Sequence, residues 1–206
     1  MKTSILNPIA IASIIALASA PAAAETFSYT FISANYSMFN EDIDGVPEDL
    51  EGNGISVSGK FNVLNNFGIL ASYGTGSADV TSSGITLDAD ISTTSIGVFF
   101  HTPVSNTVDF VLGAGIIRGN VDMEINGSPL PSEDADGNAI IAGIRAMASD
   151  KVEIDVFIDR TKIESDSSTD ISFDASYYVD KIFTIDAGYS FDSDGSSISF
   201  GATKYF

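Results

Sequence analysis

The sequence contains no cysteine and few basic residues. Without cysteine, the chain has no disulfide framework, no thiol chemistry and no cysteine metal site. Nine Lys and Arg stand against 28 Asp and Glu, so the formal net charge is −19. Nucleic acid is therefore not an expected partner, because binding to phosphate groups needs a basic surface.

Long apolar runs are missing from residue 21 onward, so no segment there has the length of a membrane-spanning helix. At the N-terminus, Lys2 is followed by a largely apolar stretch from Ile5 to Ala20 and by small residues at 22–24. This order of features is typical of a secretory signal peptide. We expect residues 1–24 to be a signal peptide cut before Glu25, with an uncleaved anchor as the alternative. Residues 25–206 then form one domain.

Alternation with a period of two dominates the remaining sequence. From Phe183 to Phe191 every second residue is apolar, and 152–158 and 171–179 repeat the pattern. This period indicates β-strands with one apolar face. The alternation changes phase near Asn35 and Thr93, which predicts bulges or misplaced strand ends there. The predicted strands are 26–39, 54–64, 67–77, 85–101, 107–121, 138–149, 151–163, 171–179, 182–191 and 196–206.

Short connections between these strands alternate with longer polar ones. The short connections are 65–66, 103–106, 149–151 and 180–181. The predicted loops on the other side are 40–53, 78–84, 126–137, 164–170 and 192–195. All of these loops except 78–84 are rich in acids, and together those four hold 14 of the 28 acidic residues and no Lys or Arg. We expect solvated loops that favour solubility; an acidic outer crown that collects divalent cations is the alternative.

The last ten residues alternate apolar and polar side chains and end on Phe206, with Gly201 five residues earlier. This tail resembles the assembly signal of bacterial outer-membrane barrels, and Gly201, Tyr205 and Phe206 would carry it. With the signal peptide and the strand pattern, the chain resembles the small Gram-negative outer-membrane proteins of the opacity and OmpA-transmembrane type. The resemblance implies an all-β, antiparallel up-and-down transmembrane barrel of about ten strands. Eight strands are the alternative if 78–84 or 192–195 is not a loop.

The same resemblance implies a location in the cell outer membrane. Outer-membrane lipid, lipopolysaccharide and the barrel-assembly machinery are then the expected partners, and the oligomeric state stays open. Apolar strand faces would contact lipid and polar faces would line the lumen. The predicted lipid-facing residues are Ile55, Val57, Phe61, Phe110, Leu112, Ile154, Val156, Phe173, Ile185, Phe200 and Phe206.

Charged residues in the middle of strands are expected inside the barrel. The predicted lumen-lining residues are Lys60, Asp88, Asp90, Asp109, Arg145, Glu153, Asp155, Asp159, Asp174 and Asp186. Barrels of eight strands are filled by side chains, and ten strands lie near that limit. We expect Lys60 and Arg145 to hold the acidic interior together. The alternative is a narrow path lined by the surplus acids, since carboxylate rings select cations.

No catalytic site is expected. Asp88-Ala89-Asp90 has the spacing of one carboxylate pair in the outer-membrane aspartyl proteases called omptins. The only histidine, His101, has no Asp two residues before it. His101-Thr102-Pro103 also lacks the His and Ser two apart that outer-membrane lipid A deacylases need. A single histidine without a base or nucleophile partner is weak evidence for catalysis.

Two short acidic segments resemble the start of a calcium-binding EF-hand loop, in which carboxylates alternate before a glycine. They are 134–137 and 192–195, and neither is followed by the glutamate that closes such a loop. We expect ordinary turns there. No cofactor is expected, and weak binding of Ca²⁺ or Mg²⁺ at the surface is the only metal chemistry retained.

The sequence therefore predicts an outer-membrane barrel with a structural or surface-interaction role through acidic extracellular loops. A narrow, cation-preferring, porin-like channel is the first alternative. A soluble periplasmic β-domain that binds an apolar ligand is the second.

Overall fold

The computed structural model describes residues 22–23, 26–42 and 49–206. Ten long strands make up this part of the chain, and each of the ten predicted strands overlaps one of them. They are β3 (Phe31–Glu41), β4 (Leu50–Leu64), β5 (Phe67–Ser82), β6 (Ile85–Ser105), β7 (Val108–Ile125), β9 (Glu133–Ser149), β10 (Val152–Ile163), β11 (Asp166–Asp180), β12 (Phe183–Phe191) and β13 (Gly195–Tyr205). Three two-residue strands are added: β1 (Ala22–Ala23), β2 (Thr26–Phe27) and β8 (Ser128–Pro129).

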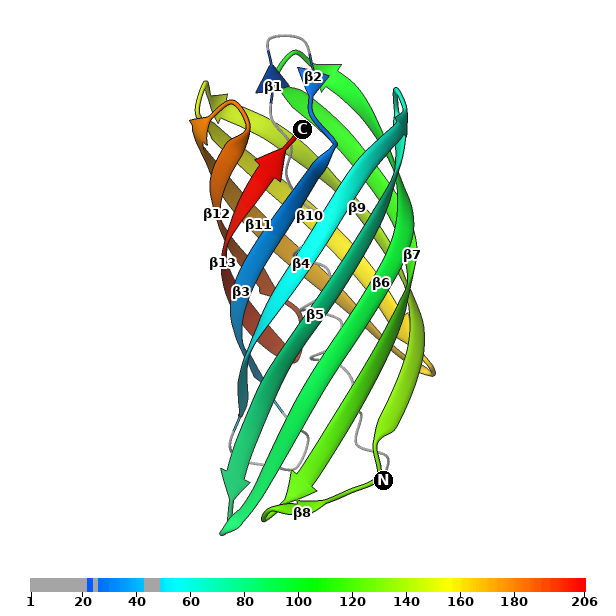
Figure 1. Cartoon of the computed structure of the whole chain (residues 1–206), viewed down its shortest axis with the longest axis vertical. Helices are drawn as coiled ribbons and strands as arrows, with labels where there is room; N and C mark the ends of the chain where they lie inside the picture. Colours follow the sequence, from blue (N-terminus) through cyan, green and yellow to red (C-terminus); the bar gives the residue numbers. More distant parts are fainter. Residues whose placement is uncertain (1–21, 24–25, 43–48) are drawn as a thin grey trace.

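The ten long strands form a closed antiparallel barrel. Each pairs with its neighbour in the sequence, and β13 pairs with β3 to close the ring. Figure 1 shows the strands tilted around one axis, as closure of a barrel requires. We call the end where β3 begins and β13 ends the terminal end, and the opposite end the far end. Two-residue connections join the strands at the terminal end, at 65–66, 106–107, 150–151 and 181–182.

Most of the predicted far-end loops are strands instead. β5 runs to Ser82 and turns through Ser83 and Gly84, which both have positive φ, as a two-residue hairpin turn requires. β9 begins at Glu133 and β11 at Asp166, so 126–137 and 164–170 are also largely strand. The loop predictions for these three segments were wrong. Residues 43–48 of the predicted loop 40–53 lie outside the described residues.

The predicted bulges near Asn35 and Thr93 are absent from the described pairing. β3 pairs with β13 and β4 without a shift in register, and the register of β6 shifts only between Pro103 and Ser105. Neither strand has a bulge where one is predicted, so another cause must explain the change of phase. The predicted signal peptide falls almost entirely on residues 1–21 and 24–25, which are not described, so its cleavage before Glu25 stays a prediction.

A belt of exposed apolar side chains surrounds the barrel. The predicted lipid-facing residues lie on this outer face, where Ile55, Leu112 and Phe200 are exposed while Phe110 and Val156 are half-buried. The outward apolar positions end within two residues of each other on β5 and β6, since Tyr73 pairs with Thr94, two residues beyond Ile96. Among the described residues, no helix is long and apolar enough to cross a membrane.

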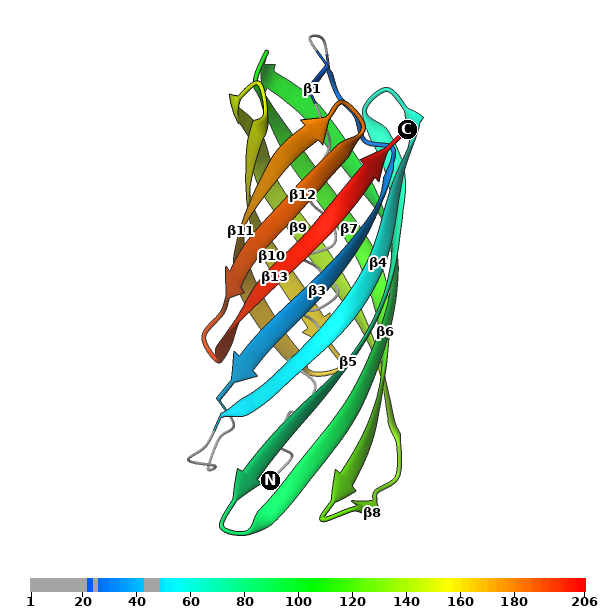
Figure 2. The same cartoon turned by 60° about the vertical axis from the view of Figure 1, so that its left-hand side comes forward.

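Beyond the belt, five strands continue at the far end. The far ends of β4, β5, β6, β7 and β9 form what we call the protruding sheet, and Figure 2 shows the tips of β5 and β6 projecting well past β12 and β13. In this sheet the polarity of the two faces is reversed. Asp88 and Asp90 of β6 point outward and are exposed, while Ala89 and Ile91 between them face inward and are buried. The prediction that Asp88 and Asp90 line the lumen was wrong for this reason.

Two apolar clusters fill the barrel at different heights. One lies behind the protruding sheet and consists of Phe39, Leu50, Ala78, Val80, Ala89, Ile91, Val121 and Met123. The other lies toward the terminal end and consists of Phe27, Tyr29, Phe31, Leu70, Phe99, Val111, Ile141, Phe157, Tyr178 and Tyr205. Charged side chains lie beside the second cluster, and these side chains form the candidate functional site.

Candidate functional site

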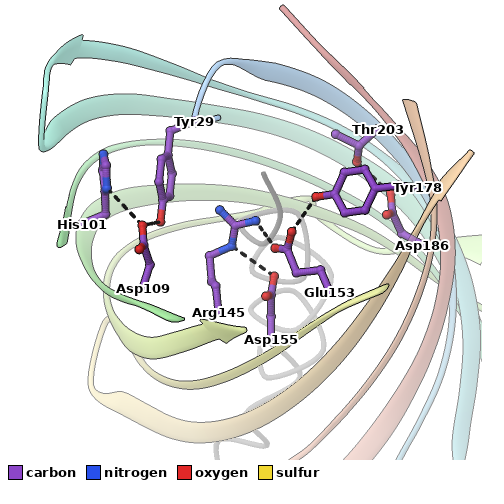
Figure 3. Close-up of polar contacts among 9 residues, drawn as sticks. All are labelled: Tyr29, His101, Asp109, Arg145, Glu153, Asp155, Tyr178, Asp186 and Thr203. Carbon is purple, nitrogen blue, oxygen red and sulfur yellow. Dashed lines mark hydrogen bonds and ion pairs between the residues drawn. The ribbon is translucent and has the colours of Figure 1, made fainter. Parts of the chain in front are cut away.

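Arg145 is the centre of a charged cluster inside the barrel. It lies on β9, with Asp109 of β7 directly opposite on one side and Asp155 of β10 directly opposite on the other. Its side chain is completely buried and forms ion pairs with Glu153 and with Asp155, the latter at 3.4 Å. Glu153 also accepts a hydrogen bond of 2.5 Å from the Tyr178 hydroxyl. Figure 3 shows these groups converging from the barrel wall.

Aromatic rings enclose the two buried cations. The Arg145 guanidinium lies 5.1 Å from the ring of Phe27 and 5.0 Å from that of Tyr29. The Lys60 ammonium lies 5.7 Å from the ring of Phe31 and 5.2 Å from that of Phe99. Such cation–π contacts contribute about 2 kcal/mol or more when they are desolvated. The predicted internal role of Lys60 and Arg145 thus includes packing as well as charge.

His101 is part of the same region. The Tyr29 hydroxyl donates a 2.8 Å hydrogen bond to Asp109, and His101 Nδ1 lies 3.5 Å from the same carboxylate oxygen. The imidazole stacks on the Tyr29 ring with centroids 3.7 Å apart. Nothing in the sequence indicates that these three side chains meet, because Tyr29 precedes β3 and Asp109 comes from another strand than His101. His101 is 3 % exposed, so its observed contacts are those of a packed side chain.

This arrangement closes the interior at the terminal end. The charges are arranged as ion pairs and hydrogen bonds, and aromatic rings fill the space between them. A buried ion pair is costly to break, because removing one partner leaves the other charge uncompensated. An ion crossing the barrel would have to displace these contacts. The geometry therefore favours a structural role for the cluster over conduction.

A second group of acids lines the inner wall of β10, β11 and β12. Asp155 is directly opposite Asp174, and Asp159 is directly opposite Asp170. Asp159 is completely buried and neither of its carboxylate oxygens has a hydrogen-bond partner. The sequence predicted Asp155, Asp159 and Asp174 inside but missed Asp170, which had been assigned to a loop. Its period-two spacing from Ser172 and Asp174 was the available signal.

Asp186 also points inward, where one carboxylate oxygen accepts a 2.7 Å hydrogen bond from Thr203. Figure 3 shows this pair beside Tyr178, with no dashed line joining it to the Arg145 cluster. The predicted lumen residues that lie on the inner face are Lys60, Asp109, Arg145, Glu153, Asp155, Asp159, Asp174 and Asp186.

The predicted assembly residues occupy different environments. Tyr205 is buried in the aromatic cluster, whereas Phe206 is 67 % exposed on the outside. Gly201 lies on the inner face of β13, where the Asn35 side chain fills the space that a Cβ would need. Their role in assembly stays a prediction.

At the far end, acidic groups lie close together at the rim. Burial raises the pKa of Glu41 to about 8, and the nearby carboxylates of Asp192, Asp194 and Asp170 add to the rise. On the outer face of the protruding sheet, Arg118 donates a 2.8 Å hydrogen bond to Asp136 and lowers the pKa of that carboxyl. Asp136 lies in β9, so the turn predicted at 134–137 was wrong. The turn at 192–195 is present, with Asp192 accepting from the N–H groups of Asp194 and Gly195.

Within the described part of the chain, no group of three or more His, Asp and Glu side chains is placed to hold a metal ion. The expectations of no cofactor and of weak surface binding of divalent cations stay predictions.

Residues 9–191 match the family model described as the outer membrane protein beta-barrel domain. The chain belongs to this family. Three solved structures are similar over most of their length. The transport unit of the autotransporter AIDA-I from Escherichia coli has 11 % identity and a TM-score of 0.58, covering 97 % of this chain and 96 % of that one. The translocator domain of the autotransporter NalP from Neisseria meningitidis has 11 % identity and a TM-score of 0.57, covering 88 % and 90 %.

The attachment invasion locus protein Ail of Yersinia pestis has 15 % identity and a TM-score of 0.48, covering 87 % of this chain and 99 % of that one. At such low identity the two autotransporter domains show the fold alone. A search of curated protein sequences found no match to this chain.

As a member of the outer membrane protein beta-barrel family, the chain is located in the outer membrane of a Gram-negative cell. The apolar belt then contacts lipid, and the hypothesis of a soluble periplasmic domain is set aside. In such barrels the short turns face the periplasm and the larger connections face outward. We therefore expect the terminal end to face the periplasm and the protruding sheet to stand outside the cell.

Proposed function

We propose that this outer-membrane barrel has a surface-interaction role and that the outer face of its protruding sheet is the interacting surface. The observation that carries the proposal is a row of carboxylates across four strands. Glu51 pairs with Asp79, Asp79 with Asp88, and Asp88 with Glu124. Asp90 and Asp122 form a second directly opposed pair. These acids replace the acidic loops that the sequence predicted.

The paired strands hold these carboxylates at fixed positions. Like charges directly opposite each other on a sheet destabilise it, so folding alone gains nothing from this row. A cationic partner would turn the repulsion into attraction. Attraction between opposite charges also speeds association, most strongly at low salt. The partner class is therefore a cationic one, such as a lysine-rich polypeptide segment.

A binding assay with matched charge changes tests the proposal. The double variant Asp88→Asn/Glu124→Gln removes two charges from the row. The control Asp150→Asn/Asp180→Asn removes two exposed acids at the terminal end. With the barrel in detergent and a lysine 20-mer as the probe, we expect the first variant to bind about 5- to 10-fold more weakly at low salt. The control should bind like wild type.

Two outcomes would contradict the proposal. Equal weakening in both double variants would mean that only net charge matters. Binding that does not change with salt would mean that the interaction is not electrostatic. Single-channel recording in planar bilayers on the same preparation tests the channel alternative. We expect a silent barrel, and discrete cation-preferring steps would favour the channel instead.

A further inference from the structure

A small cavity lies on the inner wall of β3, β11, β12 and β13. Its volume is about 10 Å³, and its polar lining includes the side chains of Asn35, Asp174, Ser176, Asp186, Ser199 and Thr203. This is close to the space that one water-sized sphere occupies. Carboxylate, hydroxyl and amide oxygens thus surround a volume that holds a single small group.

The two carboxylates of this cavity are incompletely satisfied. Asp174 Oδ2 and Asp186 Oδ1 are both buried without a hydrogen-bond partner. Neither residue forms an ion pair with a described residue. The buried Arg145 pairs with Glu153 and Asp155 instead. Asp155 stands directly opposite Asp174 and is itself 1 % exposed, with Oδ1 unpartnered. A buried charge without a partner is costly, so ionised carboxylates in this cavity would need a positive charge between them.

Two glycines leave room for the oxygens of this cavity. A Cβ at Gly188 would clash with Asp174 Oδ1 and would lie 2.6 Å from Ser199 Oγ. A Cβ at Gly201 would clash with Asn35 Oδ1. A Cβ at Gly188 would therefore force the Asp174 and Ser199 side-chain oxygens to move from their positions at the cavity. The cavity and its ligand-like oxygens depend on both positions.

We propose that this cavity binds a single hard divalent cation of the Ca²⁺ type. Hard cations take oxygen ligands from carboxylates and neutral groups, which is the set that Asp174, Asp186, Asn35 and Ser199 supply. Two carboxylates balance the charge of one divalent ion. This interior site is separate from the outer acidic row and does not depend on the proposed surface role.

The cation reaches the cavity from the outside. At the terminal end the Arg145 cluster and the aromatic side chains close the barrel. Toward the far end lie Asp170, four residues along β11 from Asp174, and its opposite partner Asp159, whose carboxylate oxygens have no hydrogen-bond partner. Glu41 lies at the rim above them. These acids give an incoming cation successive attractive positions.

Calorimetric titration of the barrel with Ca²⁺ tests the site. The protein is purified from outer membranes in detergent and treated with chelator, and its melting temperature is followed by circular dichroism. Wild type should bind one Ca²⁺ in the cavity and melt at a higher temperature with it. Asp174→Asn should weaken this binding by about 10-fold or more, because the charge of the ligands sets affinity. Asp150→Asn, which removes a charge at a terminal-end turn, should bind like wild type.

One further variant and one further measurement separate the site from a folding defect. Gly188→Ala keeps both carboxylates but fills their space, so it should lose the bound ion. Without Ca²⁺, Asp174→Asn should melt at a higher temperature than wild type, since it removes an uncompensated buried charge. This stabilisation shows that the variant folds, even if Gly188→Ala does not.

Three results would overturn the inference. Unchanged Ca²⁺ affinity in Asp174→Asn would place the ion elsewhere, and loss of affinity in Asp88→Asn would place it on the outer acidic row. Absence of binding to wild type at millimolar Ca²⁺ would mean that the cavity holds a water molecule or a proton shared by the carboxylates.

Discussion

The membrane-spanning belt and the protruding sheet are made from the same strands but have opposite polarity. Along the outer side of β6, Phe100, Val98 and Ile96 are apolar, and Asp90 and Asp88 further along are charged. The inner side changes in the opposite sense, from serine and threonine to a buried apolar cluster. No shift in register separates the two parts. The surrounding medium, lipid or water, decides which face is apolar.

The two interiors differ as well. Inside the belt, buried charges are held by partners and aromatic rings, as for Arg145. Inside the protruding sheet, apolar side chains pack on each other, as in the core of a water-soluble protein. The first interior depends on charge balance, and the second depends on the removal of apolar surface from water. Substitutions can therefore test each region separately.

The largest effect is expected for Arg145→Met. The change leaves Glu153 and Asp155 buried without their cation, which should destabilise the barrel by about 3–5 kcal/mol. Urea unfolding in detergent, followed by the mobility difference between heated and unheated protein on gels, measures the loss. The triple variant Arg145→Met/Glu153→Gln/Asp155→Asn should recover part of it. A single variant as stable as wild type would show that the cluster contributes nothing to folding.

The next largest loss of stability is expected when a charge is placed on the outer face of the belt rather than on the outer face of the protruding sheet. Val98→Arg would place a charge in lipid between the membrane midplane and the boundary at Ile96, and should destabilise the barrel by about 2 kcal/mol. The matched variant Ser92→Arg places the same side chain six residues along the same face, in water, and should cost almost nothing. Unfolding of both variants from lipid vesicles gives the difference. Equal costs would contradict the assigned membrane boundary.

The interior of the protruding sheet is tested by Val121→Ala. Val121 is 1 % exposed, so loss of two methyl groups should destabilise this region by about 1–3 kcal/mol. Hydrogen exchange should show faster exchange at the tips of β6 and β7 and unchanged protection in the belt. Uniformly faster exchange in the belt would mean that the two regions unfold together.

A pH effect is expected at the rim near Glu41, which lies beyond Met38, the last lipid-facing residue of β3. Between the ordinary pKa of 4.5 and the raised pKa of about 8, the folded protein keeps a proton that the unfolded chain releases. Stability should therefore fall as the pH rises through this interval, by about 1 kcal/mol if the rim opens locally. Glu41→Gln should remove this part of the pH dependence, as measured by hydrogen exchange at several pH values.

The smallest effect is expected for Asp88→Asn. The change removes like-charge repulsion with Asp79 and Glu124 and should stabilise the protruding sheet by about 0.2–1 kcal/mol. The gain should disappear in 1 M salt, where the screening length is about 3 Å. Unfolding at low and high salt measures both values. A loss of stability at low salt would show that the carboxylates do not repel each other.

The strand order and the lipid-facing side could be predicted from the sequence because both follow from a period of two. The protruding sheet could not be predicted, because the prediction assumes that the outer face of a strand contacts the same medium, lipid or water, along its whole length. Beyond Thr94 the apolar residues move to the other face, which looked like a bulge or a loop. Asp88 and Asp90 were placed inside for the same reason.

The charged interior was only partly predictable. Mid-strand charges such as Arg145 and Asp155 are visible in the sequence as polar positions between apolar ones. Their partners come from other strands or, for Phe27 and Tyr29, from the segment before the first long strand. The register between strands decides which of these side chains meet, and this register cannot be inferred from the alternation pattern of a single sequence. The cavity beside Gly188 depends on four strands and was not predicted.

The height of the protruding sheet has an electrostatic consequence. Asp88 lies eight residues beyond Ile96, the last lipid-facing position of β6, which is about 20 Å along the barrel axis for a tilted strand. The Debye length at physiological ionic strength is about 8 Å. Asp88 therefore stands about two screening lengths beyond the last lipid-facing residue of its strand, whereas Glu51 of the same row lies only four residues beyond Ile55, about 10 Å along the axis. Changes in the charge of the surrounding lipids should therefore alter the field less at Asp88 than at Glu51, so the tip of the sheet attracts cations most independently of the lipid.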